Sequence, residues 1–249
     1  MYRLAVPMAK LGTLHCFPTP LSQGVVRDYM APGMIETMSG IDQWIVETPK
    51  TARAHLKAML PDVHLPSMQM ASIDKHTSYQ AKQLLEPCLQ GHDMGLISDA
   101  GSPAIADPGN LVVSAAHALH VPVKPWSGPN SIMMLLMATG FNGQHFQFHG
   151  YLPHDKGERK HALRNMEQHA SRGVTQLWIE TPFRSVKHLE ELSQALHHNS
   201  LLAVGCDLTG QREWIRSMQI KEWKDLIKQG EHQKLNKRPC VFAIGKPGE

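Results

Sequence analysis

The stretch Gly95-Leu96-Ile97-Ser98-Asp99-Ala100-Gly101-Ser102-Pro103-Ala104-Ile105-Ala106-Asp107-Pro108-Gly109 decides how this chain folds. It opens as a short apolar strand, from Met94 to Ile97, and continues as a loop of small, turn-forming residues. Asp107-Pro108 predicts a helix start, with a capping carboxylate followed by proline at the first helical position. An amphipathic helix over residues 110–120 and a strand over residues 121–126 follow. The order strand, loop, helix, strand predicts an α/β unit with a parallel sheet.

The composition of this loop is compatible with two interpretations. In α/β units of this kind, ligands bind at the carboxyl ends of the strands, where small side chains let the backbone approach them. Glycine and proline are also the ordinary residues of connecting loops, and from composition alone this second interpretation is about as good. The other motifs of the chain are therefore needed to choose between a binding loop and a plain connection.

Length and composition place the chain among ordinary globular proteins. Its 249 residues suit one large domain or two small ones, with enough residues for a substantial core. The hydrophobic fraction of 42% and the charged fraction of 19% are typical of a soluble protein. The net charge of +3 is too weak to indicate a nucleic-acid partner by itself.

Several classes of protein are disfavoured by the residues that are present. Cys16, Cys88, Cys206 and Cys240 lie far apart and form no CxxC pair, which predicts free, buried thiols in a reducing cytoplasm rather than disulfides or a metal site. Without a long apolar segment we expect neither a signal peptide nor a membrane span. The GxGxxG, P-loop and HExxH patterns are absent, which disfavours nicotinamide, nucleoside-triphosphate and metal chemistry.

Chemically useful side chains follow the predicted strands of the first half. The strand over residues 44–46 ends at Glu47, and Lys50 and Arg53 follow at the start of a predicted helix. This group could orient a substrate, or it could form a surface salt bridge of little energetic value. His76 is a second candidate, although a lone histidine is more often structural or solvated than catalytic.

The second half of the chain begins after Ser127-Gly128-Pro129, which predicts a boundary between a domain over residues 1–127 and a domain over residues 128–249. A polar, basic helix follows a strand near Tyr151. Its helical spacing places several of four cations on one face: Lys156, Arg159, Lys160 and Arg164. Such a face binds phosphate groups or is simply solvated, and we weigh the two about evenly.

The motifs and their order resemble the tetrapyrrole-methylase superfamily, in the branch that methylates ribose of small-subunit ribosomal RNA. The resemblance runs from about Gly12 to Gly245. Besides the opening loop, the segments that carry it are Phe17-Pro18-Thr19-Pro20, Glu47 with Arg53, Ser127-Gly128-Pro129-Asn130-Ser131, Phe148-His149-Gly150-Tyr151-Leu152-Pro153, Glu180-Thr181-Pro182-Phe183-Arg184 and Asp207-Leu208-Thr209. The chain looks like a shorter, divergent relative of the ribosomal enzyme.

This resemblance implies two α/β domains, each with a roughly five-stranded sheet, and S-adenosylmethionine bound in the cleft between them. The implied cofactor-binding residues are Pro20, Ala100, Gly101, Ser102, Ile105, Asn130, Ser131, Glu180, Leu208, Pro239 and Cys240. Glu47, His76 and Arg53 become candidate catalytic residues, and the basic helix becomes a candidate RNA-binding surface. The resemblance further implies a homodimer.

Two departures from the family pattern leave the function open. The loop over residues 23–28 carries fewer glycines than is usual, and Ile73-Asp74-Lys75-His76 stands where relatives carry a His-Glu-His-Asn cluster. Three hypotheses follow: a methyltransferase acting on RNA, a methyltransferase acting on a tetrapyrrole or another small molecule, and a binding or regulatory protein that has lost catalysis. The first is the best supported.

Overall fold

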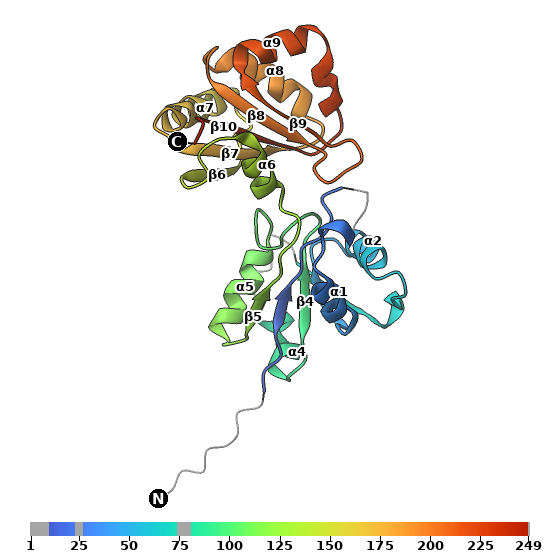
Figure 1. The fold of residues 1–249 in the computed structure, drawn as a ribbon. Coiled ribbons are helices and arrows are strands. Elements are labelled where there is room, and N and C mark those ends of the chain that lie inside the picture. Colours follow the sequence, from blue (N-terminus) through green and yellow to red (C-terminus); the bar gives the residue numbers. More distant parts are fainter. Residues whose placement is uncertain (1–9, 23–26, 74–80, 249) are drawn as a thin grey trace, which may run out of the picture. The chain divides into compact units, whose positions relative to one another are not determined.

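The chain is organised into two compact units (Figure 1). The computed structural model describes residues 10–22, 27–73 and 81–248, and it divides into an N-terminal unit that ends at Pro129 and a C-terminal unit that begins at Asn130. Each unit contains a five-stranded sheet, which confirms the predicted α/β class and the predicted size of the two sheets.

The sheet of the N-terminal unit is parallel at every strand pair, in the order β3-β2-β4-β1-β5. Its strands are β1 (Leu14–Cys16), β2 (Gln43–Val46), β3 (Gln69–Ser72), β4 (Met94–Ile97) and β5 (Val123–Pro125). Because the strands are parallel, the loops that follow them all emerge at one edge of the sheet. The quoted loop follows β4, the central strand.

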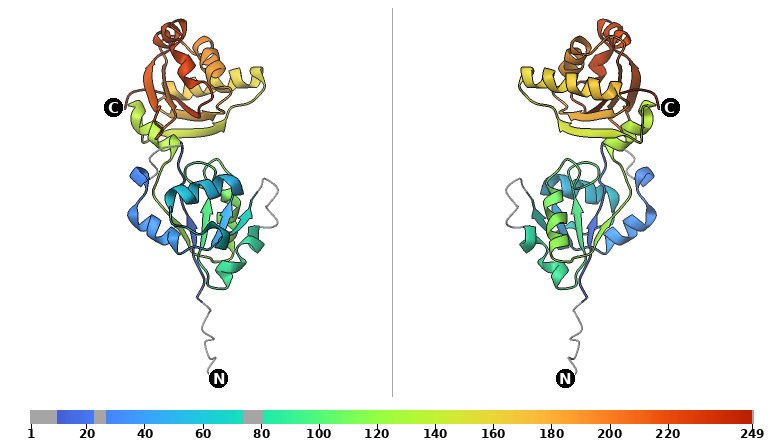
Figure 2. Two further views of the ribbon diagram at one scale, coloured as in Figure 1. Left: turned by 90° about the vertical axis from the view of Figure 1, so that its right-hand side faces the viewer. Right: turned by 90° about the vertical axis from the view of Figure 1, so that its left-hand side faces the viewer.

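Both faces of this sheet are covered by helices, and the strand residues alternate between two cores (Figures 1 and 2). Trp44 and Val46 pack with α1 (Pro32–Ser39) and α2 (Pro49–Met59). Ile45 lies on the other face, which is covered by α3 (Ala81–Leu84), α4 (Glu86–Leu89) and α5 (Gly109–Ala118). Alternation with a period of two is the signature of a strand buried on both sides.

Local sequence patterns also predict a short edge strand over residues 65–70 and a helix over residues 78–90 with Ser78 as its cap, and both predictions need correction. The first segment is a 3₁₀ turn, η2 (Leu65–Ser67), followed by β3. The described part of the second segment is broken into α3 and α4, and Ser78 lies outside the described residues. Pro87 lies in the first turn of α4, where its missing N–H costs no helical hydrogen bond.

The sheet of the C-terminal unit is mixed, in the order β6-β7-β10-β8-β9. Its strands are β6 (Phe146–Tyr151), β7 (Thr175–Glu180), β8 (Leu201–Cys206), β9 (Trp214–Gln219) and β10 (Cys240–Gly245). Only β6 and β7 pair in parallel, and the other three pairs are antiparallel. One face packs on α7 (Lys156–Ser171), α8 (Ser185–Ala195) and α9 (Ile220–Lys228), around Trp178 and Phe242.

The remaining face of this sheet is contacted by α6 (Ser131–Thr139). Two short 3₁₀ segments, η1 (Arg27–Tyr29) and η4 (Glu231–Leu235), complete the elements named here. The four cysteines are free and buried, as predicted. Among the described residues, no helix has both the length and the apolar character needed to cross a bilayer.

Candidate functional site

The loops after β1 and β4 are joined at the carboxyl edge of the N-terminal sheet. Thr19 and Gly101 exchange two backbone hydrogen bonds, of 2.9 and 3.1 Å, and the Thr19 hydroxyl donates to the Ser98 carbonyl at 3.1 Å. Gly101 has φ +77°, a conformation that glycine adopts at little cost. Pro20 is buried directly after this junction. The predicted residues Pro20 and Gly101, which are 81 positions apart, therefore belong to one small region.

A second junction connects the ends of β2 and β4. The Asp99 backbone N–H donates to Glu47 Oε2 at 3.2 Å, and the Asp99 carboxylate accepts from the Thr48 hydroxyl at 2.7 Å and from the Thr48 N–H at 3.2 Å. His55 Nε2, on α2, lies 2.9 Å from the Asp99 carbonyl oxygen. Two carboxylates and one imidazole thus surround the start of the quoted loop.

The middle of the quoted loop is held in an unusual backbone conformation. Ala104 and Ala106 both have positive φ, of 68° and 65°, which costs about 1 kcal/mol or more for a residue with a Cβ. The carboxylate of Asp107 compensates, because its Oδ1 accepts from the N–H groups of Ala104 at 2.9 Å and Gly109 at 2.7 Å. Burial raises the pKa of Asp107, although these backbone hydrogen bonds oppose the shift.

The predicted start of the following helix is off by one residue. α5 begins at Gly109, so Pro108 occupies the N-cap position and not the first helical position. Asp107 nevertheless satisfies the first helical N–H, as a capping carboxylate does. The shift arises because the same carboxylate must also hold the loop at Ala104.

Apolar side chains of the loop remain open to solvent. Ile105 is 47% exposed, and the neighbouring Ala100 is exposed as well. Ser102 is half-buried, and its hydroxyl donates to the Pro129 carbonyl at 3.3 Å. A surface of small and apolar groups suits a ligand that approaches the main chain closely.

The predicted cofactor residues of the C-terminal unit gather at one end of its sheet. Glu180 at the end of β7 pairs with Cys240 at the start of β10, and Cys240 pairs with Cys206 at the end of β8. Leu208 follows β8 and is buried, whereas Pro239 is exposed. Four of the six predicted residues of this unit therefore lie along one end of three adjacent strands.

The orientation of α6 directs the other two predicted residues to the same end. Phe141, just after α6, forms a bridge with Pro247 and packs against Gly245, at the far end of β10. The opposite end of α6, with Asn130 and Ser131, therefore points toward the end of the sheet that holds Glu180. The Asn130 side-chain oxygen caps this helix by accepting from the N–H groups of residues 132 and 133, at 3.1 and 3.0 Å.

Glu180 and Cys240 are buried, and both interact with neighbouring side chains or backbone groups. Glu180 is 6% exposed, accepts from the Thr181 N–H at 2.7 Å and forms an ion pair with Arg184 at 3.2 Å. A hydrogen bond to Cys206 and burial both raise the pKa of Cys240, so its thiol stays protonated at neutral pH. Cys240 can line a site but does not act as a thiolate nucleophile.

The basic helix α7 presents three of its four predicted cations to solvent. Lys156, Lys160 and Arg164 are exposed, but Arg159 is only 7% exposed. Its guanidinium donates to Glu191 Oε2 at 2.9 and 3.1 Å and to the carbonyl oxygens of residues 153 and 154 at 2.9 and 2.8 Å. Arg159 therefore ties α7 to α8, in addition to any role toward a ligand.

The chain is similar in sequence to known proteins, although no protein-family model matches it. It is 27% identical over 221 residues to "Ribosomal RNA small subunit methyltransferase I" of Vibrio cholerae, covering 89% of this chain and 73% of that protein. The protein of the same name from Escherichia coli O157:H7 is 26% identical over 238 residues, covering 96% of this chain and 80% of that protein. The chain is a divergent relative of these proteins.

Solved structures of other proteins have the same fold. A uroporphyrin-III-C-methyltransferase from Thermus thermophilus superposes with a TM-score of 0.55 at 14% identity, covering 94% of this chain and 92% of that one. The methyltransferase CobJ superposes with a TM-score of 0.60 at 16% identity, covering 94% of both chains. At this identity the likeness concerns the fold. The α/β fold that the resemblance implies is confirmed.

The structure adds residues that the sequence motifs did not single out. Thr48 and His55 join Glu47 and Asp99 at the edge of the N-terminal sheet. His55 lies one helical turn after Thr51 on α2. No local sequence pattern shows that its ring contacts the backbone of Asp99, which is 44 residues away in the chain. Arg53, a predicted catalytic residue, is exposed on α2, and His76 lies outside the described residues.

Proposed function

We propose that this chain is an S-adenosylmethionine-dependent methyltransferase whose acceptor is a ribose hydroxyl of RNA. The observation that carries the proposal is the similarity to proteins named as ribosomal RNA small subunit methyltransferases, which extends over 89–96% of the chain. The loops at the carboxyl edge of the N-terminal sheet support it, because they offer small side chains and exposed apolar surface to a ligand.

The residues of the chain fit the methyl donor. In the N-terminal unit the proposed contacts are Ala100, Gly101, Ser102 and Ile105, with Pro20 beside them. Ile105 is 47% exposed, so it leaves apolar surface that a bound adenosine would cover. Proposed contacts in the C-terminal unit are Asn130, Ser131, Glu180, Leu208, Pro239 and Cys240.

The chemistry is a displacement at carbon in which the ribose oxygen forms a bond to the methyl group, the carbon–sulfur bond breaks, and the hydroxyl proton leaves. When bound, S-adenosylmethionine supplies the electrophilic methyl group on a positively charged sulfur. The task of the protein is to hold the hydroxyl oxygen in line with that methyl group, which is where positioning contributes most. A carboxylate within hydrogen-bond distance of the hydroxyl would accept its proton.

Glu47 is the proposed proton acceptor, and Asp99 lies beside it. Each carboxylate lies at a strand end and is oriented by backbone or hydroxyl donors. Asp99 accepts two hydrogen bonds from Thr48, and Glu47 accepts a hydrogen bond from the Asp99 N–H. We place Glu47 nearer the proton-accepting role and Asp99 as the residue that positions it. Arg53 and His76 remain proposed partners of the acceptor.

Two measurements test this function separately. Titration calorimetry with S-adenosylmethionine and its demethylated product measures donor binding, and saturable heat is expected. Mass mapping of ribosomal RNA with and without the gene measures the methyl acceptor, and we expect one methylated ribose to be lost. No detectable donor binding would contradict a methyltransferase of any kind. Donor binding with unchanged RNA would direct the search to a small-molecule acceptor.

A further inference from the structure

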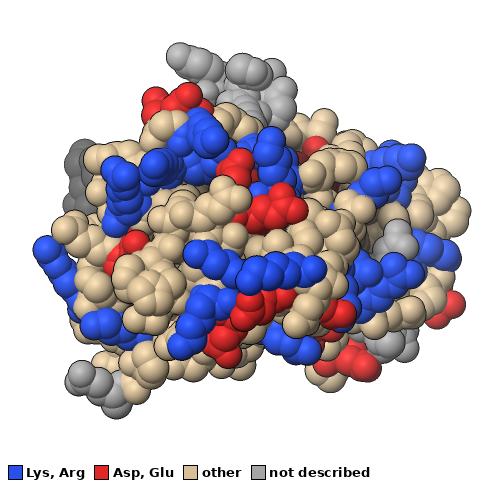
Figure 3. Space-filling view, turned by 90° about the horizontal axis from the view of Figure 1, so that it is seen from above, with Lys and Arg blue, Asp and Glu red and all other residues tan. Residues whose placement is uncertain are grey.

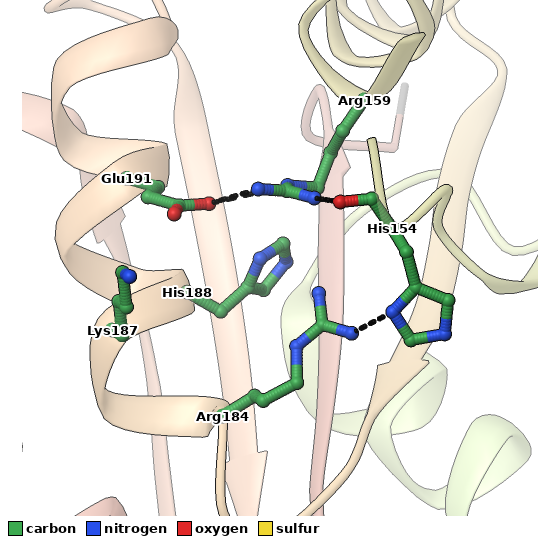
Figure 4. Close-up of a pocket in the computed structure, with 6 residues that line it drawn as sticks. All are labelled: His154, Arg159, Arg184, Lys187, His188 and Glu191. Carbon is green, nitrogen blue, oxygen red and sulfur yellow. Dashed lines mark hydrogen bonds and ion pairs between the residues drawn. The ribbon is translucent and has the colours of Figure 1, made fainter. Parts of the chain in front are cut away.

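A pocket of about 400 Å³ opens in the C-terminal unit, beside the start of α8 (Figure 4). It is lined by His154, Arg159, Arg184, Lys187, His188 and Glu191. These side chains come from the segment before α7, from α7 itself, from α8 and from Arg184, which directly precedes α8. Arg159 is the only one of them that the sequence motifs marked for substrate binding.

His188 gives this pocket an unsatisfied hydrogen-bond donor. Its ring is 3% exposed, and the Trp178 indole N–H donates to its Nε2 at 2.8 Å. Nε2 is therefore the acceptor nitrogen, so the proton of the neutral ring is on Nδ1. Within residues 10–22, 27–73 and 81–248, this buried Nδ1 has no hydrogen-bond partner. A buried donor without an acceptor is costly and indicates a missing ligand or water.

Two guanidinium groups flank this imidazole (Figure 4). Arg159 on one side is paired with Glu191, and Arg184 on the other is paired with Glu180 and with the His154 ring. Burial and these two cations lower the pKa of His188 to about 3, so the ring is neutral at physiological pH. Its Nδ1–H is thus a fixed donor between two positive groups.

Lys187 provides a cation that no carboxylate neutralises. Its side chain is exposed at the pocket, and it forms no ion pair with any residue of the part of the chain that the structure describes. Arg159 and Arg184, by contrast, are each balanced by one carboxylate. The lining, taken together with the Glu180 that pairs with Arg184, therefore carries one positive charge in excess, which suits the single negative charge of a phosphodiester.

We propose that this pocket binds one backbone phosphate of an RNA acceptor, with Lys187, Arg184 and the His188 Nδ1–H as its donors. This inference rests on the proposed function. Phe183, which directly precedes Arg184, is 84% exposed, and an exposed aromatic ring beside a phosphate site is a surface on which an unpaired base stacks. Inorganic phosphate cannot stack on an aromatic ring, so the exposed Phe183 beside the pocket favours RNA as the ligand.

The surface next to the pocket would allow a bound RNA strand to continue past it. A second hollow of about 270 Å³ shares Arg159 and Glu191 with the first, and Lys156 and Lys160 line it. Figure 3 shows Lys and Arg side chains spread over one face of the molecule, with Asp and Glu between them. Exposed cations on both sides of one ion pair match a ligand with repeated negative charges.

The test compares Lys187→Gln with a matched control, Lys221→Gln. Lys221 is an exposed lysine of the same unit, and its backbone N–H contacts His198, beyond the end of α8 and away from the pocket. The affinity of each full-length protein for a single-stranded RNA oligonucleotide is measured across a salt series. The slope of log affinity against log salt should fall by about 0.7 in Lys187→Gln and stay unchanged in the control.

A second measurement reads the pocket directly. The His188 Nδ1–H is followed by NMR of the wild-type protein with labelled histidine, with RNA and, separately, with inorganic phosphate. The proposal predicts a shifted His188 signal with RNA, which inorganic phosphate competes away only at high concentration.

Each outcome has a defined meaning. Equal salt slopes for the two variants, with an unmoved His188 signal in a protein that binds RNA, would overturn the pocket and leave the proposed function intact. A His188 signal that responds to inorganic phosphate but not to RNA would also overturn the proposal. A wild-type protein that binds no RNA at all would overturn both the pocket and the RNA acceptor, while donor binding is judged by calorimetry.

Discussion

The two regions of interest in this protein are built in opposite ways. The loop after β4 consists of small residues, and its shape is fixed by backbone hydrogen bonds and by one carboxylate, Asp107. The pocket beside α8 consists of long charged side chains anchored on two helices. The first region brings main chain and apolar groups close to a ligand, whereas the second presents charge. The loop after β4 would select its ligand by shape, and the pocket beside α8 would select its ligand by charge.

This difference predicts different responses to mutation. A small-residue loop is sensitive to added volume, because any new side chain occupies the space of the ligand. A charged pocket is sensitive to lost partners, because a buried charge without its counterion destabilises the fold. The four predictions below test this contrast, from the largest expected effect to the smallest.

Loss of the buried cation should have the largest effect on stability. Arg159→Ala removes a guanidinium that makes two hydrogen bonds to Glu191 and two to backbone carbonyl oxygens. The free energy of unfolding of the C-terminal unit should fall by about 3 kcal/mol, measured by urea denaturation with tryptophan fluorescence. Lys160→Ala, at the exposed neighbouring position, is the control. Equal stabilities would show that the pair is a solvated contact.

Added volume in the loop should abolish donor binding without unfolding the protein. Gly101 is a poor position for this test, since its φ of +77° makes any side chain strained and a Cβ would meet Leu21 at 3.0 Å. Ala100→Trp avoids the strain, because Ala100 is exposed and has no positive φ. Calorimetry should show at least a hundredfold loss, about 2.7 kcal/mol. Ala58→Trp, exposed on α2, is the control. Unchanged affinity would place the donor elsewhere.

Acid should destabilise the C-terminal unit through His188. Burial lowers its folded-state pKa from 6.5 to about 3, so protonation favours the unfolded chain. The stabilising contribution is complete above pH 6.5 and is lost progressively as the pH falls toward 3, with about 2.5 kcal/mol lost by roughly pH 4.5. Urea denaturation at both pH values measures it. His188→Gln keeps an acceptor for Trp178 and should lack this part of the pH dependence. An identical pH dependence in the variant would contradict the assignment.

Removal of the loop carboxylate should have the smallest effect. Asp107→Ala deletes the acceptor of the Ala104 and Gly109 N–H groups, which should cost about 1–2 kcal/mol and weaken donor binding. Asp107→Asn keeps one carbonyl oxygen and should retain most of the stability. Because burial raises the Asp107 pKa, its ionisation opposes folding as the pH rises above about 4, and neither variant should show that contribution. Equal stabilities of the Ala and Asn variants would contradict the capping role.

Local patterns in the sequence were sufficient for most of the elements and for the α/β class of the fold. The strand, loop and helix around residues 95–109 and the basic helix that begins at Lys156 follow from short-range periodicity and turn residues, whereas the five-stranded size of each sheet came from the family resemblance. The predicted start of α5 is wrong by one residue, because one side chain has two partners there. The Asp107 carboxylate accepts from the N–H of Gly109, the first helical residue, and also from the N–H of Ala104 in the loop.

The motifs also marked most of the residues at the candidate site, but not their partners. Glu47 and the loop over 98–102 were found, whereas Thr48, His55 and the contact between Thr19 and Gly101 were not. Arg159 was expected among exposed cations and is instead buried against Glu191. Helical spacing alone does not say which face of α7 meets α8.

By itself, the sequence determined where strands end and which residues are small, apolar or charged at those ends, because these properties depend on neighbours a few positions apart. Only the tertiary structure decided that Thr19 meets Gly101, that Glu47 meets Asp99 and that His188 keeps an unpaired Nδ1–H between two arginines. Such contacts depend on strand order and on the burial of one helix face against another. Both arise from packing between segments that are distant in the chain.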